Sequence, residues 1–254
     1  MKRFASLFVL GILLANCTFP PAQPPTNAAP TVQPIQPTTP PPTTTAAPPT
    51  PTAIPSPTPI TSVRFAVIGD YGQAGPDLAA VAHLVIGWGP DLILTVGDNN
   101  YPDGSAETID ENVGQYFHAY IGDYQGAYGV GSETNRFFPT LGNHDWNTAN
   151  GTPYLDYFTL PGNERYYQFS WGPVDFFALD SDSRNPDGIG RSSVQGQWLQ
   201  SALAASDAAW QVVYFHVTPY SSGTHGDYPP LQWPFKAWGA DLVIAGHDHV
   251  YERL

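Results

Sequence analysis

The chain has 254 residues and a formal net charge of −13, with 22 acidic residues against nine Lys and Arg. So acidic a protein lacks the basic surface that nucleic-acid binding needs, and we expect no nucleic acid among its partners. Its single cysteine, Cys17, excludes an intrachain disulfide.

The first 17 residues have the layout of a signal peptide. Lys2 and Arg3 precede an apolar run over residues 4–14, which is too short to span a membrane. The Leu-Ala-Asn-Cys sequence at 14–17 resembles a bacterial lipobox, although Asn16 replaces the small residue usual there. We expect a secreted or extracytoplasmic protein that a lipid on Cys17 anchors to the membrane. The alternative is an ordinary signal peptide with an incidental cysteine.

Residues 18–62 form a Pro/Thr-rich segment that includes sixteen prolines, and no charged residue occurs between Arg3 and Arg64. This composition buries too little apolar surface to offset the entropy of ordering, so we predict a disordered, extended linker. Residues 63–254 are long enough for one domain with its own core. All 22 acidic residues lie in this domain.

The domain alternates apolar runs typical of buried strands with amphipathic segments typical of helices. Strands are predicted at 63–68, 91–96, 137–141, 166–171, 174–179, 210–215 and 242–245. Helices are predicted at 76–88, 107–121, 193–205 and 231–238. In the first helix, Leu78, Val81, Ala82 and Val85 are expected to face inward. This order predicts a layered α/β fold.

Polar residues follow five of these strands, at the edge where α/β sheets bind ligands. The five motifs are Gly69-Asp70-Tyr71-Gly72, Gly97-Asp98-Asn99-Asn100-Tyr101, Gly142-Asn143-His144-Asp145, Val213-Tyr214-Phe215-His216 and Gly246-His247-Asp248-His249. Each motif alone is weak evidence, because Gly-Asp after a strand is usually a turn. Their joint occurrence indicates a metal site, because imidazole and carboxylate are common metal ligands.

Together, these motifs resemble those of the calcineurin-like metallophosphoesterases. Tyr101, three positions after Asp98, makes the chain similar to the purple acid phosphatases, particularly the small, tartrate-resistant type. The resemblance implies an α-β-β-α sandwich and a hydrolase of phosphoric monoesters that uses a dinuclear metal centre, with metal-bound hydroxide as the nucleophile. A phosphodiesterase or nucleotidase of the same superfamily is one alternative. A tethered surface-binding module without catalytic activity is another.

The resemblance also implies a ligand set. Asp70, Tyr101 and His249 would bind Fe(III). Asn143, His216 and His247 would bind a divalent Fe, Zn or Mn ion, and Asp98 would bridge the two. Hard anionic oxygens suit a trivalent ion, and imidazoles with an amide suit a divalent one.

Two further histidines, His144 and His225, are the expected catalytic residues, each as a general acid or as a contact to phosphate. Asp145 either orients His144 or caps a turn. Trp146 is a candidate for the wall of the substrate pocket. His83 and His118 fall within predicted helices and are expected to have no functional role.

The chain stops at Leu254, five residues after His249, where family members usually continue with further strands. We therefore expect part of the second sheet to be missing and the chain to be poorly stable. The sequence leaves the substrate and the oligomeric state open.

Overall fold

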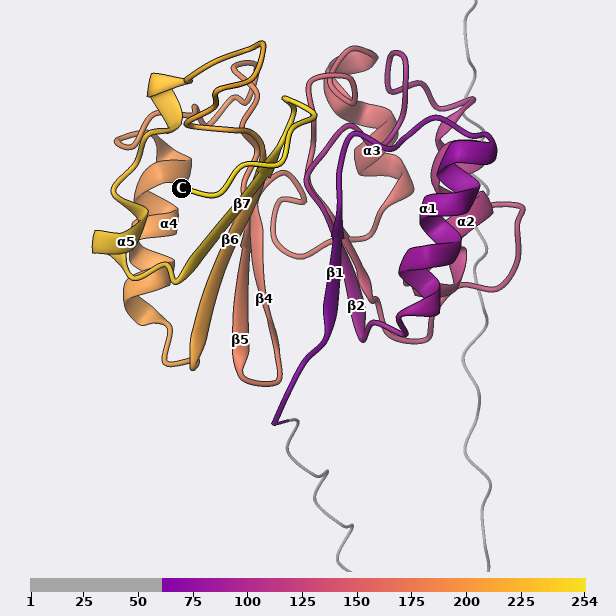
Figure 1. Ribbon diagram of the computed structural model, residues 1–254, viewed down its shortest axis with the longest axis horizontal. Helices are drawn as coiled ribbons and strands as arrows, with labels where there is room; N and C mark the ends of the chain where they lie inside the picture. The colour runs from indigo at the N-terminus through magenta and orange to yellow at the C-terminus, as the bar shows by residue number, and fades with distance from the viewer. Residues whose placement is uncertain (1–60) are drawn as a thin grey trace, which may run out of the picture. The chain divides into compact units, whose positions relative to one another are not determined.

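Two β-sheets organise residues 61–254, the part of the chain that the computed structural model describes (Figure 1). The predicted signal peptide at 1–17 and nearly all of the predicted linker at 18–62 lie outside these residues. The first sheet is parallel, in the order β1-β2-β3. Its strands are β1 (Phe65–Ile68), β2 (Leu92–Thr95) and β3 (Phe137–Pro139).

The second sheet has the order β4-β5-β6-β7. Its strands are β4 (Tyr167–Trp171), β5 (Val174–Ala178), β6 (Trp210–Val217) and β7 (Leu242–Gly246). The β4–β5 pair is antiparallel, as the sequence predicts, and β5, β6 and β7 run parallel. The carboxyl ends of β5, β6 and β7 therefore lie at one edge of this sheet.

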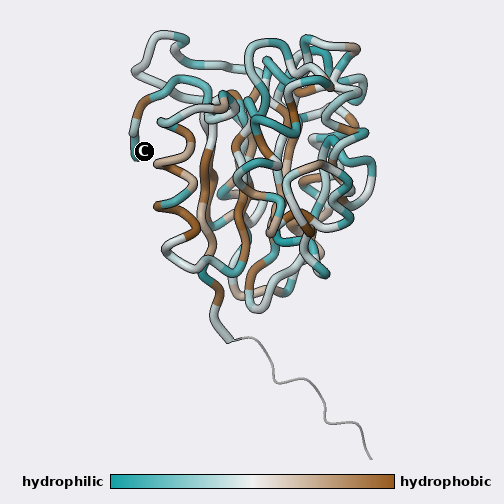
Figure 2. The backbone as a smooth tube through the Cα atoms, turned by 90° about the vertical axis from the view of Figure 1, so that its right-hand side faces the viewer, coloured by the Kyte–Doolittle hydropathy of each residue, from teal (hydrophilic) through white to brown (hydrophobic). Residues whose placement is uncertain are grey.

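Aromatic side chains fill the space between the two sheets. Phe138 of β3 stacks on Phe169 of β4, with ring centroids 3.7 Å apart. Phe65 of β1 meets the edge of Phe176 of β5, with centroids 5.3 Å apart. Figure 2 shows brown, hydrophobic stretches on the extended segments that run through the interior of the domain. Because this core is shared, each sheet depends on the other for burial of its inner face.

Helices cover the outer face of each sheet (Figure 1). The first sheet is covered by α1 (Pro76–Gly87), the π-helical turn η1 (Asp110–Gly114), α2 (Gln115–Phe117) and the 3₁₀ turn η2 (His118–Tyr120). The second is covered by α4 (Val194–Ala205), the 3₁₀ turn η4 (Pro229–Leu231) and α5 (Phe235–Trp238). The 3₁₀ turn η3 (Ala149–Gly151) and α3 (Thr152–Tyr157) follow β3. Among the helices of residues 61–254, none is long and apolar enough to cross a bilayer.

The layered α/β prediction is confirmed, but several local predictions are wrong. The segment predicted as one helix at 107–121 is helical over 110–120, but it passes from a π-helical turn to α2 and then to a 3₁₀ turn. The Asp110 carboxylate, in the π-helical turn, accepts hydrogen bonds from the hydroxyls of Tyr124 (2.6 Å) and Tyr157 (2.7 Å). Val81 is 43% exposed, because the buried face of α1 is narrower than predicted. The helix predicted at 231–238 is split into η4 and α5, and α3 was not predicted.

Candidate metal centre

The candidate ligands lie where the parallel strands of both sheets end. Asp70, Asp98 and Asn143 follow β1, β2 and β3, whereas His216 lies near the end of β6 and His247 directly follows β7. Because these strand ends meet at one edge of the sandwich, five chain segments deliver side chains to a common point. Tyr101 and His249 come from the loops after β2 and β7.

His216 lies at the middle of this group and is fully buried. Its Nε2 atom is 3.0 Å from the amide Oδ1 of Asn143 and 3.1 Å from Nδ1 of His247. The same nitrogen is 3.5 Å from Oδ2 of Asp98. The three residues that the family resemblance assigns to a divalent ion therefore converge beside the expected bridging carboxylate.

The other predicted ligands adjoin the same carboxylate. The hydroxyl of Tyr101 donates to Oδ2 of Asp98 over 3.1 Å. Nε2 of His249 lies 3.3 Å from Oδ1 of Asp70. Asp70, Asp98 and His216 each place a ligand atom within 4.8 Å of the other two. All seven predicted ligands are thus brought together in one continuous cluster.

The electrostatics of this cluster favour a cation. Oδ1 of Asp70 is buried without a hydrogen-bond partner, while Oδ2 accepts from the backbone N–H of His247 over 3.0 Å. Burial, and secondarily the Asp98 carboxylate, raises the pKa of Asp70. Burial and the same carboxylate also raise the pKa of Tyr101 well above its usual range, so its phenolate forms only beside a cation. Two adjacent carboxylates, one of them with an oxygen that accepts no hydrogen bond, fit a metal centre.

The imidazoles are held in the form that binds metal. Nδ1 of His216 faces the carbonyl of Val96 over 2.7 Å; a carbonyl only accepts, so Nδ1 carries the proton and Nε2 presents its lone pair to the centre. Burial, and secondarily the nearby imidazole of His216, lowers the pKa of His247 to about 4. His247 is therefore neutral over the physiological range.

The backbone around the centre is strained at four of the seven ligands. The φ angles of Asp70, Asp98, His247 and His249 are 53°, 53°, 78° and 52°. Non-glycine residues seldom adopt this left-handed region, and they do so mostly where function or tertiary structure imposes it. The fold thus holds these side chains in conformations that local sequence disfavours.

The two predicted catalytic histidines border the cluster and are accessible. Nε2 of His144 lies 3.9 Å from Oδ2 of Asp98, and its side chain is 36% exposed. The exposed ring of His225 lies over that of His247, with centroids 4.2 Å apart. His83 is exposed on α1, and Nδ1 of His118 hydrogen-bonds to the carbonyl of Gly114, so both lie in helical segments as expected.

Asp145 does not orient His144. Its buried carboxylate instead accepts from the backbone N–H of Gly142 (2.8 Å) and from the backbone N–H (3.1 Å) and side-chain amide (2.9 Å) of Asn99. These bonds tie the loop after β3 to the loop after β2. The side-chain amide of Asn99 is thereby engaged with Asp145 and with the carbonyl of Thr140.

Trp146 does not wall an open pocket, because it is only 2% exposed. Its indole N–H donates to Oδ1 of Asp180 over 3.1 Å, and the guanidinium of Arg184 lies 5.7 Å from its ring centroid. The segment that contains Asp180 and Arg184 was missed by the sequence analysis, because neither residue belongs to a recognisable metal motif.

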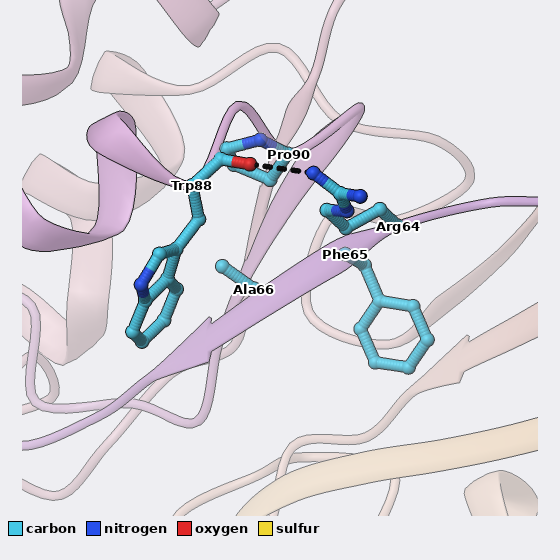
Figure 3. Close-up of a pocket in the computed structure, with 5 residues that line it drawn as sticks. All are labelled: Arg64, Phe65, Ala66, Trp88 and Pro90. Carbon is cyan, nitrogen blue, oxygen red and sulfur yellow. Dashed lines mark hydrogen bonds between the residues drawn. The ribbon is translucent and has the colours of Figure 1, made fainter.

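A pocket of about 410 Å³ lies at the opposite ends of β1 and β2 and is remote from this chemistry. Figure 3 shows Trp88 and Pro90 beside Arg64, whose guanidinium donates to the carbonyl of Trp88 over 2.9 Å. Of the five lining residues, only Arg64 is ionisable. This pocket therefore has no set of metal ligands.

Residues 63–251 match the family model of the calcineurin-like phosphoesterases. The chain belongs to the calcineurin-like phosphoesterase family. The match covers all five motifs, so the family resemblance stated from the sequence is confirmed, and the family implies a dinuclear metal centre.

Relatives within this family include purple acid phosphatases. Purple acid phosphatase 17 of Arabidopsis thaliana is 27% identical over 229 residues, which cover 76% of this chain and 64% of that protein. An uncharacterized protein of Mycobacterium tuberculosis is 30% identical over 148 residues, which cover 46% of this chain and 27% of that protein. This calcineurin-like phosphoesterase thus spans less than two thirds of the length of either relative.

A solved structure has the same fold. It is the purple acid phosphatase from yellow lupin (Lupinus luteus) seeds, with a TM-score of 0.57 and 19% sequence identity. The match covers 76% of this chain and 39% of the lupin chain. The sandwich predicted from the sequence is therefore the fold of a purple acid phosphatase.

Proposed function

We propose that this protein is a phosphoric monoester hydrolase of the purple acid phosphatase type with a dinuclear metal centre. The observation that carries the proposal is the convergence of seven side chains from both sheets in one cluster at the edge of the sandwich. The family of the chain and its similarity to purple acid phosphatases support it. The residues are Asp70, Asp98, Tyr101, Asn143, His216, His247 and His249.

The donor atoms divide into two sets. Asp70, Tyr101 and His249 would hold Fe(III), because two of them supply hard oxygens that become anionic beside a cation. Asn143, His216 and His247 would hold a divalent Fe, Zn or Mn ion through neutral donors. Asp98 contacts both sets. Such a pair of metals, when bound, polarises the phosphoryl oxygens and activates water.

His144 is the proposed general acid. Its Nδ1 hydrogen-bonds to the carbonyl of Pro102, which can only accept, so Nδ1 keeps its proton and Nε2 exchanges one. Nε2 is also the atom that faces Asp98 and the centre. A proton on it can pass to the oxygen of the leaving alcohol.

His225 is the proposed contact to phosphate. The backbone N–H of His225 donates to Oδ1 of Asp248 over 2.9 Å, which fixes the exposed loop beside the centre. The ring stays accessible on one side and packs on His247 on the other. A protonated ring there would pair with an anionic phosphoryl oxygen.

We also propose that the protein works outside the cytoplasm, tethered by a lipid on Cys17, with residues 18–62 as the spacer. The basic and apolar leader followed by Cys17 supports this. Metabolic labelling with a radioactive fatty acid tests it: the wild type should be labelled in membranes, and Cys17→Ser should not. An unlabelled wild type would contradict the anchor.

The catalytic proposal is tested with an aryl phosphate and the corresponding bis-aryl diester on protein loaded with iron and zinc. The wild type should hydrolyse the monoester. Asp98→Ala should lower kcat/KM for the monoester by at least about 100-fold. Asp156→Ala removes an exposed carboxylate and, as the control, should match the wild type. Turnover of the diester alone would favour a phosphodiesterase. Turnover of neither ester would favour a non-catalytic binding module.

A further inference from the structure

β5 ends at the same edge as the strands that supply the candidate ligands, yet the segment after it supplies none of them. This segment, residues 179–185, leaves the second sheet between β5 and α4. It contains Asp180 and Asp182, both buried, and Arg184, which is partly exposed. Its side chains reach the loop after β3 and the end of β6, both of which carry ligands.

The guanidinium of Arg184 joins this segment to the loop after β3. Its Nε and Nη2 each donate over 2.7 Å to one oxygen of the Asp182 carboxylate, which forms a bidentate pair. Nη2 also donates to the backbone carbonyl of Asn143 over 2.9 Å, and Nη1 donates to Oδ1 of Asn147 over 3.0 Å. Four of the five N–H groups of the guanidinium are thereby used within the protein.

The same segment also holds the neighbourhood of His216. The hydroxyl of Ser181 accepts from the backbone N–H of Val217 over 2.8 Å, directly after His216. Asp180 accepts from the indole of Trp146, three positions after Asn143. Residues 180–184 therefore connect the loop after β3 with the end of β6, whose side chains Asn143 and His216 meet 3.0 Å apart.

We propose that Arg184 is a positioning residue that fixes Asn143 against His216 and so sets the affinity of the divalent site. The inference rests on the proposed function, in which both residues are metal ligands. Asn143 supplies a neutral amide oxygen, so its contribution depends on being held in place before the ion arrives. Loss of such an outer contact typically weakens metal binding by about 10–100-fold.

The bidentate pair makes arginine specific at this position. A lysine at 184 keeps the positive charge beside Asp182, which would otherwise be left buried and unpaired. It has no planar fork, so it cannot pair with Asp182 and bind the carbonyl of Asn143 in the same geometry. Arg184→Lys therefore separates positioning from simple charge balance, and Arg184→Met removes both.

The test is calorimetric titration of metal-free full-length protein with Zn²⁺ alone. The wild type should bind two ions. Arg184→Lys and Arg184→Met should bind one ion at least about 10-fold more weakly and the other with unchanged affinity. Arg191→Met, at an exposed arginine just before α4, should match the wild type. If Arg184→Met does not fold, as judged by circular dichroism, Arg184→Lys decides the outcome.

Unchanged Zn²⁺ affinity at both sites in the folded Arg184 variants would overturn the inference. Inorganic phosphate provides a second readout: a 10-fold weaker inhibition by phosphate with unchanged Zn²⁺ binding would make Arg184 a substrate contact and also overturn it. Fewer than two ions on the wild type would instead overturn the proposed function. The two failures are therefore distinguishable.

Discussion

Oδ2 of Asp98 lies 3.5 Å from Nε2 of His216, although Asp98 follows β2 of the first sheet and His216 belongs to β6 of the second. The contact exists only while the sheets are packed through their shared aromatic core. Formation of the centre is thus linked to folding, and ions that bind there should stabilise the native state.

Tyr101→Phe tests the identity of the metal. With Fe(III) bound beside Tyr101, the wild type should show a visible tyrosinate-to-iron absorption band, and the variant should lose it. The phenol loses its proton only near a cation, because burial and Asp98 raise its pKa. Absorption spectroscopy after iron loading measures the band. An iron-loaded wild type without the band would disprove the assignment of Tyr101 to iron.

Asp145→Ala tests the network behind the ligands. The change strips Asn99 and Gly142 of their acceptor and leaves buried N–H groups unsatisfied, at a cost of about 2–4 kcal/mol in the free energy of unfolding. Urea denaturation measures this loss. Asp156→Ala, which removes an exposed carboxylate, is the control and should change stability by less than about 0.5 kcal/mol. Equal effects of the two changes would refute a structural role for Asp145.

The sequence predicts the layers through its alternation of strands and helices, and it suggests the ligand set only through the resemblance of its five motifs to those of a known family. It could not predict the role of Asp145, because adjacency to His144 says nothing about where a carboxylate turns. Arg184 was missed because its contact with the backbone carbonyl of Asn143 forms only through the tertiary fold. The left-handed backbone at Asp70 and His247 was also not predicted, because Asp and His adopt it more often than most residues but still only rarely.

Gly97→Ala tests how tightly the two sheets meet at the centre. Gly97 has φ 88°, and a Cβ there would lie 2.6 Å from Nδ1 of His216. Gly89 has φ 60° and open space around it, so Gly89→Ala measures backbone strain alone. Thermal unfolding should show that Gly89→Ala lowers the free energy of unfolding by about 1–2 kcal/mol. Gly97→Ala should lower it by at least about 1 kcal/mol more. Similar losses in both would mean that the sheets are loosely apposed there.

Asp180→Asn tests a pH dependence of stability. Burial raises the pKa of Asp180 to about 7 from an ordinary value of 3.8, and its Oδ2 has no hydrogen-bond partner. A raised carboxyl pKa favours the native state in acid. This stabilisation is complete below about pH 4 and is lost as the pH rises through about 7.

The asparagine at position 180 cannot ionise. The free energy of unfolding of Asp180→Asn, relative to that of the wild type, should therefore rise by about 1–3 kcal/mol between pH 4 and pH 8. Urea denaturation at both pH values measures the difference. Asp207→Asn, at an exposed position, is the control and should show no such rise. If the difference in unfolding free energy between Asp180→Asn and the wild type does not change with pH, Asp180 is not a buried carboxyl with a raised pKa.

The central claim is that seven side chains form one centre for two ions. Its most direct test is elemental analysis of the purified chain after loading with iron and zinc, for the wild type and for Asp98→Ala. The account predicts two metal ions per wild-type chain and at most one per Asp98→Ala chain. Fewer than two ions in the wild type, or two retained after loss of Asp98, would contradict it.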